Sequence, residues 1–145
     1  MRVYFTIPGE PHGKGRPKFS TYGGRVTART PEKTVVYENL VRLEYQRQCG
    51  DVRFEDNAQL AVTIDAYYTI PKSASKKKKA NMQNGLIRPT KKPDCDNVIK
   101  CVLDSLNSIA YHDDAQVVTV ECRKLYSETP RVEVEICHFD HVLPF

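Results

Sequence analysis

A long stretch of alternating apolar residues constrains this fold more than any other feature of the sequence. Within residues 59–70, apolar side chains recur at every second position: Leu60, Val62, Ile64, Ala66, Tyr68 and Ile70. A period of two predicts a β-strand whose one face is buried. Pro71 has no backbone N–H to donate, so it ends the strand. A strand of this length needs neighbours, so the chain must build a sheet.

Shorter alternating segments supply those neighbours. Residues 3–7, 118–122 and 132–136 each alternate apolar and polar side chains, which predicts three more strands. The last two are separated by a turn at residues 127–130, and we interpret them as a C-terminal hairpin. The Gly23-Gly24 pair predicts a tight turn in a small β-ribbon over residues 18–28.

Two segments have helical spacing. Thr30 as the N-cap and Pro31 at the first position begin one helix, which continues through Val36, Leu40 and Leu43 and ends at Gly50. An apolar stripe predicts the second helix over residues 97–108. The predicted fold is therefore α+β: a compact single domain over residues 1–145, with a mixed β-sheet and two main helices.

The basic residues are concentrated in two stretches. Residues 12–31 and 71–92 together hold 13 of the 22 basic residues and none of the 18 acidic ones. We predict that residues 72–92 form an exposed basic loop or a short mobile helix, since they carry few apolar side chains. Segregated positive charge favours a polyanionic partner, although the lysine run at residues 76–79 alone is equally typical of a solvated loop tip.

Other features exclude several classes of protein. The five cysteines form no C-x-x-C pair, which argues against a disulfide framework and a structural zinc site. No apolar run is long enough for a membrane span, and the first residues lack the apolar core of a signal peptide. We therefore expect a cytoplasmic protein with no membrane partner.

Carboxylates gather around the start of the second helix. Asp94 and Asp96 stand two residues apart, so in an extended chain both side chains point to one side and can share a cation. Lys100 lies four residues after Asp96, one helical turn along the same face. Asp113 and Asp114 would join them after a tight return of the chain. An all-oxygen site suits Mg²⁺ or Mn²⁺ and phosphoryl chemistry.

Each part of this set also has a structural interpretation. Asp96 or Asn97 would serve as a helix cap, Asp113-Asp114 as a turn and Lys100 as a surface residue. The functional interpretation gains weight because the acids are flanked by Lys91, Lys92 and the basic stretch.

The order and spacing of these residues resemble a known family. Its signature is similar to four segments here, namely Ile7-Pro8-Gly9, Gly13-Lys14-Gly15-Arg16-Pro17, Pro93-Asp94-Cys95-Asp96-Asn97 followed by Lys100, Asp104, Leu106 and Asn107, and Asp113-Asp114-Ala115-Gln116-Val117. The family is that of the RusA-type Holliday junction resolvases, and the resemblance covers residues 3–137 or so.

This resemblance implies a Mg²⁺-dependent endonuclease, with Mn²⁺ as a possible substitute, that resolves four-way branched DNA as a homodimer. It matches Asp94, Asp96 and Asp114 to metal-binding aspartates that are also catalytic, Lys100 to the catalytic lysine and Asp113 to an adjacent acidic position of the metal site. We expect DNA phosphates to be bound by basic residues of both stretches: Lys14, Arg16, Lys18, Lys76, Lys77, Lys78, Lys79, Lys91 and Lys92. Two alternatives are a flap or other branched-DNA nuclease of the same chemistry and a non-catalytic nucleic-acid-binding module.

Overall fold

The centre of the molecule is a four-stranded mixed sheet. The computed structural model describes residues 1–139. The sheet has the order β1-β6-β4-β5 and is built from β1 (Arg2–Pro8), β6 (Arg131–His138), β4 (Leu60–Thr69) and β5 (Val117–Ser127). Strand β4 runs parallel to β5 and antiparallel to β6. The alternating segment that dominates the sequence is therefore an inner strand, and the predicted mixed sheet is confirmed.

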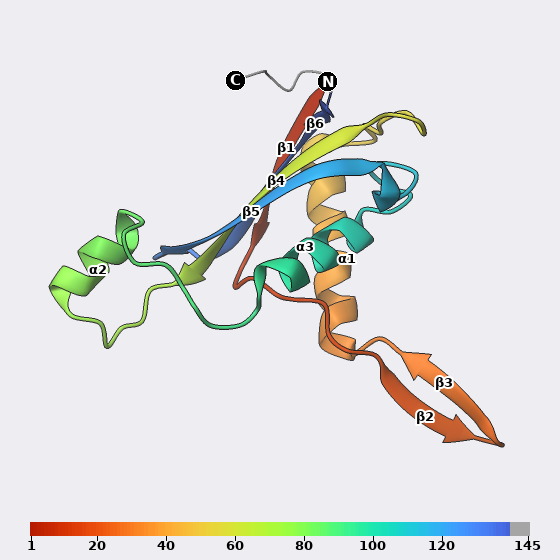
Figure 1. Cartoon of the computed structure of the whole chain (residues 1–145), viewed down its shortest axis with the longest axis horizontal. Helices are drawn as coiled ribbons and strands as arrows, with labels where there is room; N and C mark the ends of the chain where they lie inside the picture. The colour runs from red at the N-terminus through yellow and green to blue at the C-terminus, as the bar shows by residue number, and fades with distance from the viewer. Residues whose placement is uncertain (140–145) are drawn as a thin grey trace.

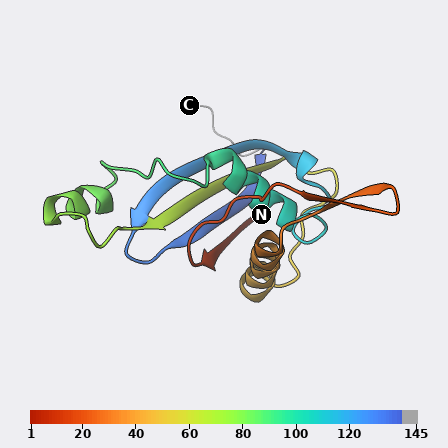
Figure 2. The ribbon, with the colours of Figure 1, turned by 90° about the horizontal axis from the view of Figure 1, so that it is seen from below.

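Two helices cover one face of this sheet (Figure 2). They are α1 (Glu32–Cys49) and α3 (Cys95–Ser105). The apolar side chains of β4 and β6 form one core cluster with Val41 and Tyr45 of α1 and Val98 and Val102 of α3. The opposite face of the sheet is more polar, and there Arg123 donates two hydrogen bonds to the Asp65 carboxylate, at 2.7 and 2.9 Å. This two-layer arrangement confirms the α+β class. No helix within residues 1–139 is both long and apolar enough to cross a membrane.

The predicted C-terminal hairpin is wrong. Strands β5 and β6 follow each other closely in the chain, but β4 lies between them in the sheet. Three linking residues in extended conformation span about 10 Å, and two strand spacings are also about 10 Å. The link can therefore cross the end of β4, where the Ile70 amide donates to the Ser127 carbonyl at 3.2 Å. The length of the link alone cannot distinguish strands that are neighbours in the sheet from strands that have one other strand between them.

Helix α1 buries a different face from the one that its apolar spacing indicates. Val36 and Leu43 are 63% and 58% exposed. The buried face instead carries Thr34, Tyr37, Glu38, Val41, Glu44 and Tyr45. The helix also begins one residue later than predicted, with Pro31 rather than Thr30 in the N-cap position, and it ends at Gly50 as expected. Three of the four large polar side chains on the buried side have hydrogen-bond partners: Tyr45 donates to the Val52 carbonyl, Glu38 accepts from Lys14, and Glu44 accepts from Arg47 and Gln48. The hydroxyl of the fourth, Tyr37, has no partner among the described residues.

Residues 72–92 fold partly as a short helix, the second of the two structures predicted for this stretch. They contain α2 (Lys76–Gln83), which Ser75 caps by accepting a hydrogen bond from the Lys78 amide at 3.2 Å. Met82 on this helix is 7% exposed. The prediction overlooked Met82 as an anchor because a single apolar residue gives no periodic pattern. Residues 1–139 therefore contain the two main helices, α1 and α3, and the short helix α2, and α3 covers residues 95–105 where residues 97–108 were predicted.

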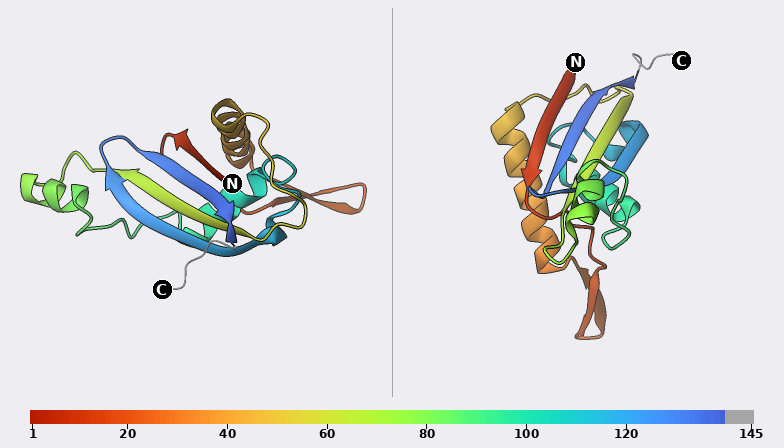
Figure 3. Two further views of the ribbon diagram at one scale, coloured as in Figure 1. Left: turned by 90° about the horizontal axis from the view of Figure 1, so that it is seen from above. Right: turned by 90° about the vertical axis from the view of Figure 1, so that its left-hand side faces the viewer.

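The predicted β-ribbon is confirmed, and it projects from the body of the molecule (Figures 1 and 3). It consists of β2 (Lys18–Tyr22) and β3 (Arg25–Arg29), joined at Gly23-Gly24. Both glycines have positive φ angles of 59° and 78°, a conformation that glycine adopts without steric strain. Figure 1 shows this hairpin and α2 at opposite ends of the molecule, with α3 between them.

Candidate functional site

Helix α3 carries the first part of the candidate site. The Tyr68 hydroxyl on β4 donates to the Pro93 carbonyl at 2.6 Å, which fixes the chain just before the helix. Asp94 occupies the N-cap position, but its side chain makes no capping hydrogen bond. Asp96 lies in the first helical turn, so the two carboxylates do not share an extended segment as predicted. Both are exposed, and the Asp94 carboxylate is free of the structural role that an N-cap aspartate usually has.

Asp104 occupies the centre of a charge network at the end of α3. The ammonium of Lys100 lies 3.7 Å from the Asp104 carboxylate, one helical turn away. Lys14 approaches the same carboxylate to 3.3 Å and donates to Glu38 of α1 at 2.7 Å. Asp104 therefore orients Lys100 and also joins α3 to the N-terminal segment.

The second group of acids lies in η1 (Asp114–Gln116), a single 3₁₀ turn before β5. Asp113 caps this turn by accepting from the Ala115 amide at 3.0 Å, and the Gln116 side chain accepts from the Asp113 amide at 3.2 Å. The Asp114 amide donates to Asn107 Oδ1 at 2.8 Å. The Asp113 carboxylate thus has a structural partner, and Asp114 is the freer of the two.

Burial and the neighbouring carboxylates raise the pKa of Asp114 above its usual range. Burial is the largest cause, followed by a hydrogen bond between the Asp114 and Asp104 side chains and by the negative charges of Asp104 and Asp113. The positive charge of Lys100 opposes this shift. A cation bound beside Asp114 would relieve the repulsion, so the local electrostatics fit a metal ligand.

The Gly-Lys-Gly segment, residues 13–15, holds α1 and α3 together. The Lys14 amide donates to the Asn97 carbonyl at 3.2 Å, and the Gly15 amide donates to Thr34 Oγ1 at 3.0 Å. A Cβ atom on Gly13 would lie 2.9 Å from the Cβ atoms of both Asn97 and Pro93. Glycine is needed here because the backbone passes close to the first turn of α3, which bears Asp96.

Lys14 is therefore directed into the protein rather than toward a ligand. Its side chain is 23% exposed. Burial alone lowers the pKa of the Lys14 ammonium, but the hydrogen bonds and charges of Glu38 and Asp104 outweigh burial and raise it. This placement favours a structural role over the predicted phosphate contact.

The other predicted DNA-binding residues remain available to a ligand. Within residues 1–139, no ion pair with an acidic side chain joins any of them: Arg16, Lys18, Lys76, Lys77, Lys78, Lys79, Lys91 and Lys92. All are exposed except Lys79, which is half-buried. The ammonium of Lys124 donates to the Lys91 carbonyl at 2.5 Å, which ties the segment before α3 to β5.

The structure does not gather all the predicted metal ligands. Within residues 1–139, no three His, Cys, Asp or Glu side chains lie close enough together to hold an ion in this arrangement. The rise along a helix explains part of the separation. Asp114 lies beside Asp104, which is eight residues, or about 12 Å, along the helix from Asp96. What the structure brings together is Lys14, Glu38, Lys100, Asp104 and Asp114.

Two residues of this network, Glu38 and Asp104, were not predicted as site residues. Asp104 could have been identified from its i, i+4 spacing to Lys100, and both Asp104 and Asn107 belong to the family-like motif. Glu38 gives no such signal, because it is 24 residues from Lys14 along the chain and the contact depends on the packing of α1.

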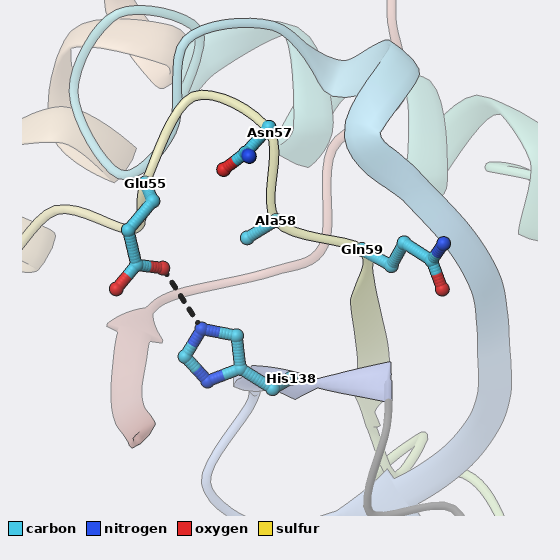
Figure 4. A pocket seen from close by; sticks show the side chains of 5 residues that line it. All are labelled: Glu55, Asn57, Ala58, Gln59 and His138. Carbon is cyan, nitrogen blue, oxygen red and sulfur yellow. Dashed lines mark hydrogen bonds and ion pairs between the residues drawn. The ribbon is translucent and has the colours of Figure 1, made fainter.

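A separate cavity lies between residues 55–59 and the end of β6 (Figure 4). Its volume is about 320 Å³ and it is lined by Glu55, Asn57, Ala58, Gln59 and His138. His138 Nε2 and Glu55 Oε2 are 3.0 Å apart across it. None of the predicted catalytic residues lines this cavity, so it is not part of the candidate site.

Comparisons with known proteins identify related sequences. The model of the family Endodeoxyribonuclease RusA matches residues 8–137. YqaN of Bacillus subtilis (strain 168), described as uncharacterized, is 41% identical over 136 residues, which cover 92% of this chain and 94% of YqaN. The crossover junction endodeoxyribonuclease rusA of Lactococcus phage r1t is 34% identical over 84 residues, or 57% of either chain.

The role of Lys14 can be tested by Lys14→Met. Removing the ammonium leaves Glu38 and Asp104 facing each other without a cation, so the free energy of unfolding should fall by about 1–3 kcal/mol. Lys18→Met, at an exposed position, should change it by less than about 0.5 kcal/mol. Urea denaturation of both variants measures the difference. Unchanged stability in Lys14→Met, together with a weaker salt dependence of DNA binding, would indicate that Lys14 contacts DNA instead.

The crowding at Asp114 predicts a gain in stability when its charge is removed. Because folding raises the pKa of this carboxyl, its ionised form destabilises the native state above that pKa. Asp114→Asn should raise the melting temperature by a few degrees at pH 7. Below pH 3.8, the ordinary pKa of this carboxyl, both Asp114 and the asparagine that replaces it are neutral. The difference in melting temperature should then disappear. A lower melting temperature for Asp114→Asn at pH 7 would contradict the proposed repulsion.

Proposed function

This chain belongs to the RusA endodeoxyribonuclease family, and we propose that it resolves four-way DNA junctions by metal-dependent, paired hydrolysis of phosphodiester bonds. The family match supports the endonuclease activity. The metal dependence and the mechanism are supported by the arrangement along α3. Lys100 lies between the exposed carboxylates at the start of the helix and the Asp104–Asp114 pair.

The proposed metal ligands are Asp94, Asp96 and Asp114, which would have to move closer together than they lie in this arrangement in order to bind one ion. They offer only oxygen donors, which suits Mg²⁺, with Mn²⁺ as a possible substitute. A bound divalent ion would supply Lewis-acid activation of the phosphodiester and of the attacking water. The hydrogen bond from Ala115 to Asp113 assigns Asp113 to the support of η1, so we favour Asp114 as the ligand from this pair.

The protein's own contribution is to place charge around the phosphate. Lys100 would stabilise the negative charge that develops on the phosphoryl oxygens or orient the attacking water. Asp104 holds the ammonium of Lys100 on the side of the helix that faces Asp114. The Gly-Lys-Gly segment holds the first turn of α3, so Asp96 keeps its place relative to Lys100.

Backbone phosphates would be bound by the exposed cations that precede α3. The lysines of α2 lie on one side, and Lys91 and Lys92 directly precede the acids. Such contacts position DNA without reading its sequence. This distribution suits a substrate that is recognised by its shape.

A homodimer suits this substrate because two identical sites can nick symmetry-related strands. The exposed aliphatic stripe of α1 is a candidate contact between the copies. If two α1 helices packed antiparallel about a twofold axis, Val36 of each copy would lie near Leu43 of the other. The same arrangement brings Glu32 near Arg47, which joins opposite charges.

Asp96→Asn separates catalysis from binding. The substitution keeps the shape of the side chain but removes an anionic ligand, so nicking of a synthetic four-way junction in Mg²⁺ should fall by orders of magnitude. Binding of the same junction in EDTA should persist or tighten, because less negative charge then faces the DNA. Asp51→Asn removes a charge at an exposed position outside the site and is the matched control. Parallel loss of binding and cleavage would indicate a folding role for Asp96 instead.

The dimer contact can be tested by Leu43→Lys. The wild-type chain should sediment as a dimer, and this variant should shift to the monomer because it places two cations in an apolar contact. Leu86→Lys, at a position that is 76% exposed on another part of the chain, is the control. A dimer that survives Leu43→Lys would exclude α1 as the interface.

A further inference from the structure

The β2–β3 hairpin lacks support from the rest of the described chain. All ten of its residues are exposed. Its principal contacts are between its own two strands. A two-stranded hairpin alone is marginally stable in water. The arrangement therefore calls for a partner that covers at least one of its faces.

The pairing register divides the hairpin into two unlike faces. Residues opposite each other in an antiparallel pair share a face, and faces alternate along each strand. The basic face therefore consists of Lys18 and Arg29, Ser20 and Thr27, and Tyr22 and Arg25. The other face consists of Phe19 and Ala28 with Thr21 and Val26. One face thus carries three cations and no acid, and the other is largely apolar.

The basic face is electrostatically unfavourable in the isolated hairpin. Lys18 stands directly opposite Arg29, and like charges in that position destabilise a strand pair. Within residues 1–139, Lys18, Arg25 and Arg29 form no ion pair. A polyanion would remove this repulsion. The charge pattern therefore favours nucleic acid over a protein surface as the partner of this face.

We propose that the basic face of the β2–β3 hairpin is a second DNA-binding arm, with Arg25 and Arg29 as phosphate contacts. The proposal rests on the junction-resolving function above and deepens it. The hairpin and the four lysines of α2 lie at opposite ends of the molecule, with α3 between them (Figures 1 and 2). A branched substrate that crosses α3 would therefore be held on both sides of the site. A two-stranded ribbon also fits the major groove of duplex DNA.

The test compares two double variants of equal charge. Arg25→Ala/Arg29→Ala removes two cations from the hairpin. Arg2→Ala/Arg53→Ala removes two exposed cations from other positions, near the starts of β1 and β4, and is the control. Binding of a fluorescent four-way junction is measured in EDTA from 50 to 200 mM salt for both variants and the wild type. Thermal melting of each variant verifies that it is folded.

Each phosphate contact contributes about 0.9 to the slope of log affinity against log salt. The hairpin variant should therefore flatten the slope by nearly 2 for each protomer whose hairpin is bound, so that its affinity falls at least about tenfold less over this salt range than that of the wild type. The control should keep the wild-type slope. A folded hairpin variant whose slope equals that of the wild type or of the control would overturn the proposal.

Two further measurements separate this inference from others. If the wild type cuts the junction in Mg²⁺ while the hairpin variant keeps the full salt slope, the second arm is wrong and the resolvase function stands. If the wild type neither binds nor cuts the junction, the proposed function itself fails. Sedimentation of Phe19→Ser tests the apolar face. Conversion of a dimer to a monomer by Phe19→Ser, together with an unchanged salt slope in Arg25→Ala/Arg29→Ala, would assign the hairpin to contact with a second copy instead.

Discussion

The ion pairs of Lys14 with Glu38 and Asp104 are the contact on which the candidate site depends. They join the N-terminal segment, α1 and α3 at one point, at distances of 2.7 and 3.3 Å. The flanking glycines allow the backbone to pass close to the first turn of α3, where a side chain would collide with Asn97 and Pro93. This contact fixes the rotation of α3 about its axis, together with the apolar face of the helix and the hydrogen bond from Tyr68 to the Pro93 carbonyl. The positions of Asp94, Asp96 and Lys100 all depend on that rotation.

The site combines two opposing electrostatic demands. The Asp104 carboxylate holds the ammonium groups of Lys14 and Lys100, yet its negative charge also raises the pKa of Asp114. The repulsion between these carboxylates destabilises the protein when no cation is bound, and a bound cation would relieve it. The protein is therefore less stable at the place where a metal would bind. The surrounding exposed cations have the complementary role, because they hold phosphates around an acidic centre that would otherwise repel DNA.

Much of the fold follows from the sequence because its elements have strong local patterns. The period of β4, the glycine turn of the ribbon and the apolar stripe of α3 each determine an element without reference to the rest of the chain. Features set by tertiary packing were not accessible in this way. The three residues that link β5 to β6 suit two sheet orders equally, and the buried face of α1 is chosen by Tyr37, Tyr45 and Glu38 rather than by its aliphatic residues. In the site, the i, i+4 spacing of Lys100 and Asp104 is enough to indicate their ion pair, whereas the inward direction of Lys14 depends on Glu38, which lies in a different element.

The central claim is that this acid-rich helix supports metal-dependent resolution of branched DNA. It is tested most directly by mapping strand cuts that the wild-type protein makes in a mobile four-way junction, a flap and a linear duplex, with Mg²⁺ and with EDTA. Our account predicts paired, symmetric nicks in the junction that require Mg²⁺, with little cutting of the linear duplex. Tight junction binding without nicks in either Mg²⁺ or Mn²⁺ would contradict it, and preferential cutting of the flap would keep the chemistry but change the substrate.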